Sequence, residues 1–205
     1  GLLVHPAGQT SRGTLSNYLA HYFQQQGIIC TIRPLHRLDR ETSGCVLFAK
    51  DSQTQTLLEK ALQDGSLKRT YLALVEGMVE PPTGTIDAPI GPHPSLPNRR
   101  AVNQKNGDQA ITHYRTVQNF AEASLLELSL ETGRTHQIRV HLAHIGHPVI
   151  GDRMYGKRSG LISGQALHAV SLRFRHPVED REVNVEAPLP PNFSRVTEAY
   201  SAKNT

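Results

Sequence analysis

The side chains with the clearest chemical potential lie in a short polar segment, residues 35–44, just before an apolar run. Asp39 is placed there between Arg37 and Arg40. Catalytic groups are often carried on loops that rigid strands hold in place. Neighbouring cations favour the ionised form of a carboxylate, which suits a nucleophile or a general base. The alternative is that Asp39 caps a turn or forms a structural ion pair.

Two further segments carry polar groups suited to a reaction site. Lys68 and Arg69 precede Tyr71, which begins an apolar run. A tyrosine there could stack on a base or help to move a proton, although core packing is the ordinary alternative. In the third segment His136 and Arg139 are three residues apart and share a face near the start of an expected helix. The helix dipole favours anions at that end, so the pair could hold a phosphate or a carboxylate such as Asp39.

Histidines at positions 141, 144 and 147 raise the alternative of a metal site. Helical zinc sites use histidines three or four residues apart, with a nearby acid as general base. Here no glutamate lies between the histidines, Pro148 limits the helix, and the surroundings are cationic. We therefore predict no metal site. Phosphate-loop, dinucleotide and Gly-x-Ser-x-Gly fingerprints are also absent from the sequence, which argues against nucleotide hydrolysis, hydride transfer and the common serine hydrolases.

The distribution of charge is more informative than the net charge of +4. Residues 33–40 contain three arginines and a histidine against one acid. Residues 132–151 contain no acid but two arginines and four histidines. Two cationic segments far apart in sequence could converge on one face that binds a polyanion. Solvated surface charge is the simpler alternative.

The elements that must position these residues follow from hydrophobic spacing. Helices are predicted over 14–26, 51–65 and 135–144, and strands over 45–49, 71–75, 111–117, 124–130, 166–174 and 182–186. Residues 80–108 hold six of the thirteen prolines and are predicted to form a long loop. Because the strands occur in clusters, the expected class is α+β with a mixed, largely antiparallel sheet.

Composition also limits where in the cell the protein is expected. No stretch reaches the roughly 18 apolar residues of a membrane helix, and the N-terminus does not resemble a secretory signal. Cys30 and Cys45 are too few for a disulfide framework or a cysteine zinc site. A cytoplasmic protein is predicted. The absence of an initiator methionine suggests that the numbering begins inside a longer natural sequence.

Together and in this order, the polar segments resemble the signature of the RluA family of pseudouridine synthases. The matching motifs are Gly-Leu-Leu-Val-His-Pro at 1–6, His-Arg-Leu-Asp at 36–39 with Thr-Ser-Gly at 42–44, Lys-Arg-Thr-Tyr-x-Ala-x-Val at 68–75, Gly-Arg-Thr-His-Gln-Ile-Arg-Val-His at 133–141, Gly-His-Pro-x-x-Gly-Asp-x-x-Tyr-Gly at 146–156 and Leu-His-Ala at 167–169. The resemblance covers residues 1 to about 191.

The resemblance implies a central mixed, mostly antiparallel sheet with flanking helices and a cleft across it. It implies that Asp39 is the catalytic aspartate, Tyr71 the active-site tyrosine and Arg139 the basic partner that holds Asp39. It also implies that the target uridine is flipped from its stack and that Arg37 fills the vacated space. The candidate RNA-binding residues are the cationic positions of the three segments: His36, Arg37, Arg40, Lys68, Arg69, Arg134 and His136. No metal or other cofactor is expected.

The resemblance therefore predicts an isomerase that converts specific uridines of structured RNA to pseudouridine. Large-subunit (23S) ribosomal RNA is the first expected substrate and transfer RNA the second. An RNA-binding or folding factor with secondary catalysis is the alternative from another class. Residues 1–205 are expected to form a single catalytic domain that acts as a monomer. The small N-terminal RNA-binding module of many family members is absent from this sequence.

Overall fold

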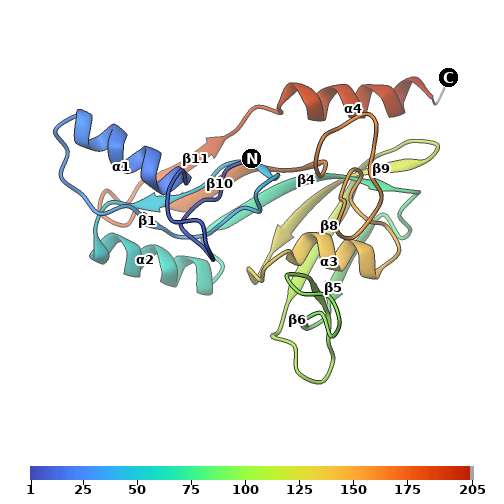
Figure 1. The fold of residues 1–205 in the computed structure, drawn as a ribbon, viewed down its shortest axis with the longest axis horizontal. Coiled ribbons are helices and arrows are strands. Elements are labelled where there is room, and N and C mark those ends of the chain that lie inside the picture. The colour runs from blue at the N-terminus through green and yellow to red at the C-terminus, as the bar shows by residue number, and fades with distance from the viewer. Residues whose placement is uncertain (204–205) are drawn as a thin grey trace.

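The computed structural model describes residues 1–203 and is built around one twisted sheet (Figure 1). Within these residues the sheet has seven strands, in the order β11-β10-β4-β9-β8-β5, with β2 added beside β10. The strands are β1 (Arg33–Pro34), β2 (Ser43–Gly44), β3 (Phe48–Ala49), β4 (Lys68–Glu76), β5 (Thr83–Asp87), β6 (Ile90–Pro92), β7 (Arg100–Val102), β8 (Ile111–Asn119), β9 (Ala123–Leu130), β10 (Leu167–Arg175) and β11 (Glu182–Glu186). The helices are α1 (Leu15–Gln25), α2 (Ser52–Gln63), α3 (Gln137–His144) and α4 (Pro191–Ala202).

Strand pairing confirms the predicted α+β class with a mixed, mostly antiparallel sheet. Neighbouring strands of the main sheet are antiparallel, whereas β2 runs parallel to β10. In the view of Figure 1, α2 and α3 lie below the sheet and α4 lies above it. The central strand β4 pairs with β9 on one side and β10 on the other. Segments from the first, middle and last parts of the chain therefore meet at β4.

Two of the predicted helices begin at the side chains that suit a helix start. Thr14 and Asn17 form a reciprocal capping box at the start of α1. The Asp51 carboxylate accepts a hydrogen bond from the backbone N–H of Thr54 at 2.7 Å and caps α2. Helix α2 buries Leu58 against the end of the sheet that holds Leu172 and Phe174.

The structure corrects three expectations about elements. Residues 45–49 are not a continuous strand: Cys45 donates to the carbonyl of Ala169, while the carbonyl of Leu47 accepts from Leu35, so the backbone bonds divide between two partners. Residues 80–108 are not a loop throughout, because β5 pairs with β8 and β6 pairs with β7. The C-terminal helix α4 was not predicted.

The main core lies on both sides of β4, β9 and β10. Ala73, Leu74 and Val75 of β4 are completely buried. Helix α4 starts with proline at its first position and inserts Phe193 and Val196 into this core. Among residues 1–203, no helix combines the length and the apolar character needed to cross a membrane.

Candidate active site

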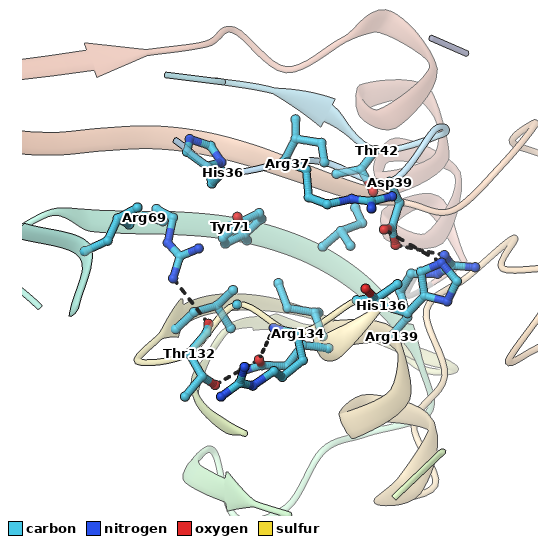
Figure 2. Close-up of a pocket in the computed structure, with 18 of the residues that line it drawn as sticks. His36, Arg37, Asp39, Thr42, Arg69, Tyr71, Thr132, Arg134, His136 and Arg139 are labelled. Atoms are coloured by element: carbon cyan, nitrogen blue, oxygen red, sulfur yellow. Dashed lines mark hydrogen bonds and ion pairs between the residues drawn. The ribbon is translucent and has the colours of Figure 1, made fainter. Parts of the chain in front are cut away.

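A cavity of about 430 Å³ opens beside β4, and three sequence segments supply most of its lining. They are residues 35–39 with Thr42, the N-terminal half of β4 with Arg69 and Tyr71, and residues 130–139 (Figure 2). Leu62, Gln63 and Leu167 complete the lining. Parts of the two cationic segments singled out in the sequence thus meet at this cavity, which was one of the two alternatives for their charge. The cavity is also the cleft that the resemblance implied.

The segment that carries Asp39 is anchored to β10 just after the aspartate. The Ser43 hydroxyl lies 2.8 Å from Nδ1 of His168, whose Nε2 lies 3.1 Å from the carbonyl of Ala187. The histidine Nε2 therefore donates to the carbonyl, and Nδ1 accepts from Ser43. Gly44 pairs with Ala169 in the parallel contact between β2 and β10. These bonds give the Thr-Ser-Gly and Leu-His-Ala motifs a structural role.

Asp39 is held by Arg139, which also binds a second carboxylate. Arg139 Nη1 donates to Asp39 Oδ2 at 2.8 Å. Its Nε and Nη2 donate to Oδ2 and Oδ1 of Asp152 at 2.6 and 2.8 Å. Burial opposes the charge of Arg139, but the hydrogen bonds and charges of Asp152 and Asp39 outweigh it and raise the arginine pKa above its usual range. The two-point contact with Asp152 fixes the plane of the guanidinium, so its remaining nitrogen faces Asp39.

Asp152 is a site residue that sequence reasoning did not single out. Its side chain is completely inaccessible to solvent. Burial raises the pKa of this carboxyl group, but the bonds from Arg139 and from the backbone N–H groups of Met154 and Tyr155 reverse the shift and lower it overall. The Gly-Asp-x-x-Tyr-Gly motif contained the signal, but nothing in its spacing shows that the aspartate faces Arg139.

His136 approaches Asp39 from the start of α3 in a left-handed backbone conformation. Its φ is 60°, in the left-handed region that few residues other than glycine adopt, although histidine enters it more often than most. The helix therefore begins at Gln137, two residues later than predicted. His136 Nε2 lies 3.8 Å from Asp39 Oδ1. His136 and Arg139 both approach Asp39, one of the two kinds of anion that the sequence suggested for them, but His136 lies before α3 and not on its face.

Tyr155 contacts both His136 and Arg139. Its hydroxyl accepts a hydrogen bond from the backbone N–H of Arg100 at 2.9 Å and lies 2.8 Å from Nδ1 of His136. With the tyrosine hydroxyl as donor to Nδ1, neutral His136 carries its proton on Nε2, toward Asp39. Burial lowers the pKa of His136, although Asp39 opposes the shift. The Arg139 guanidinium lies 5.0 Å from the centre of the Tyr155 ring.

Tyr71 and Arg69 lie on the same face of β4, because alternate residues of a strand point to the same side. Tyr71 lines the cavity and is only 4% exposed. Burial raises the pKa of its phenol, which stays neutral at neutral pH. Arg69 also lines the cavity, and its Nη2 donates to the carbonyl of Thr132 at 3.2 Å.

His36 is a neutral histidine at the same end of the cavity as Arg69 (Figure 2). Its Nε2 accepts a hydrogen bond from the backbone N–H of Leu47 at 3.1 Å, so Nδ1 carries the proton. Burial, with a smaller contribution from the charge of Arg69, lowers the pKa of His36 to about 4. His36 therefore supplies a neutral donor rather than a cation.

The remaining candidate RNA-binding residues divide between the cavity and the surface beside it. Arg37 and Arg134 line the cavity. Arg40 is exposed beside a neighbouring hollow that also contains Arg153. Lys68 is exposed and alternates to the opposite side of β4 from Arg69 and Tyr71, so neither Arg40 nor Lys68 belongs to the cavity.

Two of the three histidines considered as metal ligands, His141 and His147, have other partners. Both ring nitrogens of His141 lie 2.9 Å from protein groups, the Thr112 hydroxyl and the Ala88 carbonyl. Nδ1 of His147 lies 2.8 Å from the carbonyl of Glu76. In the part of the chain that the structure describes, no three histidine, cysteine, aspartate or glutamate side chains come together as a metal site would require.

Comparison with known proteins identifies the family. The sequence profile described as RNA pseudouridylate synthase matches residues 1–144. The chain is 44% identical to "Uncharacterized RNA pseudouridine synthase YhcT" of Bacillus subtilis, over 98% of this chain and 67% of that protein. It is 39% identical to "Ribosomal large subunit pseudouridine synthase D" of Escherichia coli, over 98% of this chain and 65% of that protein. The chain belongs to the RNA pseudouridylate synthase family.

A solved structure supports the same assignment. The structure of human RNA Pseudouridylate Synthase Domain Containing 1 superimposes with a TM-score of 0.72 at 26% identity, over 92% of this chain and 85% of that one. The family profile ends before Asp152, Tyr155 and β10, all of which contact the site in this family member. The chain spans only 67% and 65% of the lengths of the two bacterial relatives.

Proposed function

We propose that this chain converts uridine in RNA to pseudouridine, with Asp39 as the catalytic residue. The observation that carries the proposal is the Asp39 carboxylate held by Arg139 at 2.8 Å in a cavity that Tyr71 also lines. Family membership and relatives named as pseudouridine synthases support the same reaction.

The isomerisation exchanges one bond for another and leaves the atomic composition of the nucleoside unchanged. The N1–C1′ glycosidic bond breaks, the base turns and C5 bonds to C1′; C5 then loses its proton to solvent, and N1 gains a proton in its place. Asp39 acts either by attack on the sugar or as the base that starts the bond cleavage. Arg139 orients the carboxylate, and the Nε2–H of His136 faces its other oxygen. None of these steps calls for a metal or redox cofactor.

The base must leave its stack to reach Asp39. Extrusion of a base costs about a few kcal/mol, and least where the RNA is already single-stranded. Stacking on an aromatic ring returns about 1–3 kcal/mol per base, a role we assign to Tyr71. Arg37, exposed at the edge of the cavity, is proposed to fill the space that the base leaves.

The first proposed substrate is large-subunit ribosomal RNA. The support is that several relatives, including the Escherichia coli protein, are named as ribosomal large subunit enzymes. We propose that His36, Arg37, Arg69, Arg134 and His136 bind RNA in and around the cavity, and that Arg40 and Lys68 bind it outside the cavity. Transfer RNA as second substrate, action as a monomer and a cytoplasmic location stay predictions from the sequence.

The test compares RNA from cells with and without the gene for this chain. Pseudouridine is mapped at single-nucleotide resolution across ribosomal and transfer RNA, and purified protein is added back. We expect a ribosomal site that is lost in the deletion and restored by wild-type protein but not by Asp39→Asn. Restoration by Asp39→Asn would contradict the catalytic role, and an unchanged map would favour an RNA-binding factor.

A further inference from the structure

Arg69 is a buried cation without a counter-ion. Only 8% of the residue is exposed. Its Nε is buried without a hydrogen-bond partner, and Nη2 has a single acceptor, the carbonyl of Thr132. Among residues 1–203, no carboxylate lies within ion-pair distance of its guanidinium.

The contrast with Arg139 shows why this arrangement needs an explanation. Taking a charge out of water is costly unless an opposite charge and hydrogen bonds replace the water. Arg139 is similarly buried but binds two carboxylates. Besides Asp39, the cavity lining contains one acid, Glu131, but Glu131 is exposed and pairs with His113. The free chain therefore leaves Arg69 unneutralised, which points to an anionic ligand.

The residues around Arg69 form a preformed binding site at one end of the cavity. Figure 2 shows His36 and Arg69 on one side of Tyr71 and Asp39, His136 and Arg139 on the other. His36 adds a second donor there, since its Nδ1 is buried and has no partner. At Gly133 a Cβ atom would lie 3.1 Å from Nη1 of Arg69, so the glycine keeps space open beside the guanidinium.

We propose that Arg69 binds a backbone phosphate adjacent to the uridine held at Asp39. The proposal rests on the proposed function, because it takes the ligand of the cavity to be RNA. A phosphate carries a full negative charge and matches the fork of a guanidinium. The carbonyl oxygens of a base are weaker partners for a buried cation. Since the phosphate of a nucleotide is joined to its ribose, a phosphate site must lie near the sugar site, as Arg69 lies near Tyr71 on the same strand face.

The first measurement is the stability of the free protein. Arg69→Met keeps the aliphatic stem and removes the unpaired charge, so we expect a melting temperature equal to or above that of the wild type. The matched control is Arg115→Met, on the opposite face of the sheet, where the arginine is exposed and pairs with Glu127 at 2.9 Å. A clear fall in the melting temperature of Arg69→Met would show that the arginine is structural and would overturn the proposal.

The second measurement uses the dinucleoside monophosphate UpU and its neutral methylphosphonate analogue as probes, with binding followed by NMR titration. We expect wild type and Arg115→Met to prefer the charged probe by about tenfold, as one charge-assisted hydrogen bond allows. Arg69→Met should lose this preference. If Arg69→Met weakens both probes equally, Arg69 binds the base instead. That result, or retention of the preference by Arg69→Met, overturns the proposal.

These probes separate the inference from the proposed reaction. The phosphate preference is a binding property and requires no turnover, whereas pseudouridine mapping reports turnover directly. A wild-type protein that shows the Arg69-dependent preference but forms no pseudouridine would contradict the proposed function alone. A protein that forms pseudouridine while Arg69→Met keeps the preference would contradict the phosphate site alone.

Discussion

Asp39 is the residue whose replacement separates chemistry from binding. Asp39→Asn keeps the shape of the side chain and removes its charge. We expect turnover to be abolished while RNA affinity stays within a few-fold, because the cationic residues of the cavity are unchanged. Turnover is measured as release of tritium from RNA labelled at uridine C5, since the reaction removes that hydrogen. Near-normal release by Asp39→Asn would show that another residue starts the reaction.

Arg139 matters for stability chiefly through Asp152. Arg139→Ala leaves the completely buried Asp152 without its counter-charge, and loss of one partner of a buried pair costs about 3–5 kcal/mol. We expect a decrease of that size in the free energy of unfolding, measured by chemical denaturation. The double variant Arg139→Ala/Asp152→Asn should recover part of the loss. A double variant as unstable as Arg139→Ala would mean that the buried charge is not the cause.

His36 makes stability depend on pH in a defined direction. Its pKa is about 4 in the folded chain against 6.5 when unperturbed, so between these values the unfolded chain binds a proton that the folded chain does not. Stability is then retained above pH 6.5 and falls as pH decreases toward 4, by up to about 3 kcal/mol. His36→Gln should reduce the loss between pH 7 and 4.5 in denaturation experiments. An unchanged loss would assign the effect to other histidines, such as His136 and His141.

At the scale of single residues, the sequence indicated which chemical groups form the site but not which of them are buried. The pairing of Asp39 with Arg139 was expected, because family motifs fix both positions. Asp152 was overlooked because its partner lies 13 positions earlier and on a different element. His36 was expected to bind RNA, and the sequence did not show that its burial and its bond to Leu47 make it a neutral donor. Burial arises from the packing of distant segments, which local spacing does not reveal.

At the scale of elements, the contact between β2 and β10 fixes the segment that carries Asp39. Gly44 has φ of 114° there, and a Cβ atom would overlap the backbone of Ala169. We expect Gly44→Ala to separate β2 from β10 and to lower both stability and turnover. The matched control is Gly160→Ala, because Gly160 is exposed and has open space around its Cβ position. Thermal melting and tritium release measure the two effects. Wild-type values for Gly44→Ala would show that this contact does not position Asp39.

The elements that sequence reasoning predicted are those with a strong local signal. Helices α1 and α2 have capping side chains, and β9 alternates apolar and polar residues. Strands β5, β6 and β7 were taken for loop because prolines and glycines surround them. Pairing defines these strands, since β5 pairs with β8 and β6 pairs with β7. Helix α4 has few apolar residues, so its inward face is set by the core that it covers.

At the scale of the whole molecule, the strand order of residues 1–203 supports the prediction that the chain is one folding unit. Strand β10, near the end of the sequence, lies between β11 and the central strand β4, and it also pairs with β2 from the beginning. Asp152, which neutralises Arg139, comes from the same late part of the chain. No division of the sequence into two parts keeps both the sheet and the site intact.

We therefore expect residues 1–205 to unfold in a single cooperative transition. Far-ultraviolet circular dichroism, which reports the helices and the sheet, and near-ultraviolet dichroism, which reports tyrosine packing, should give the same denaturation midpoint. A chain ending at residue 144, where the family profile stops, should show no cooperative transition, because it lacks β10 and leaves Arg139 without Asp152. Two separate midpoints for the full chain, or cooperative unfolding of the shorter one, would show that the site is built on a smaller independent unit.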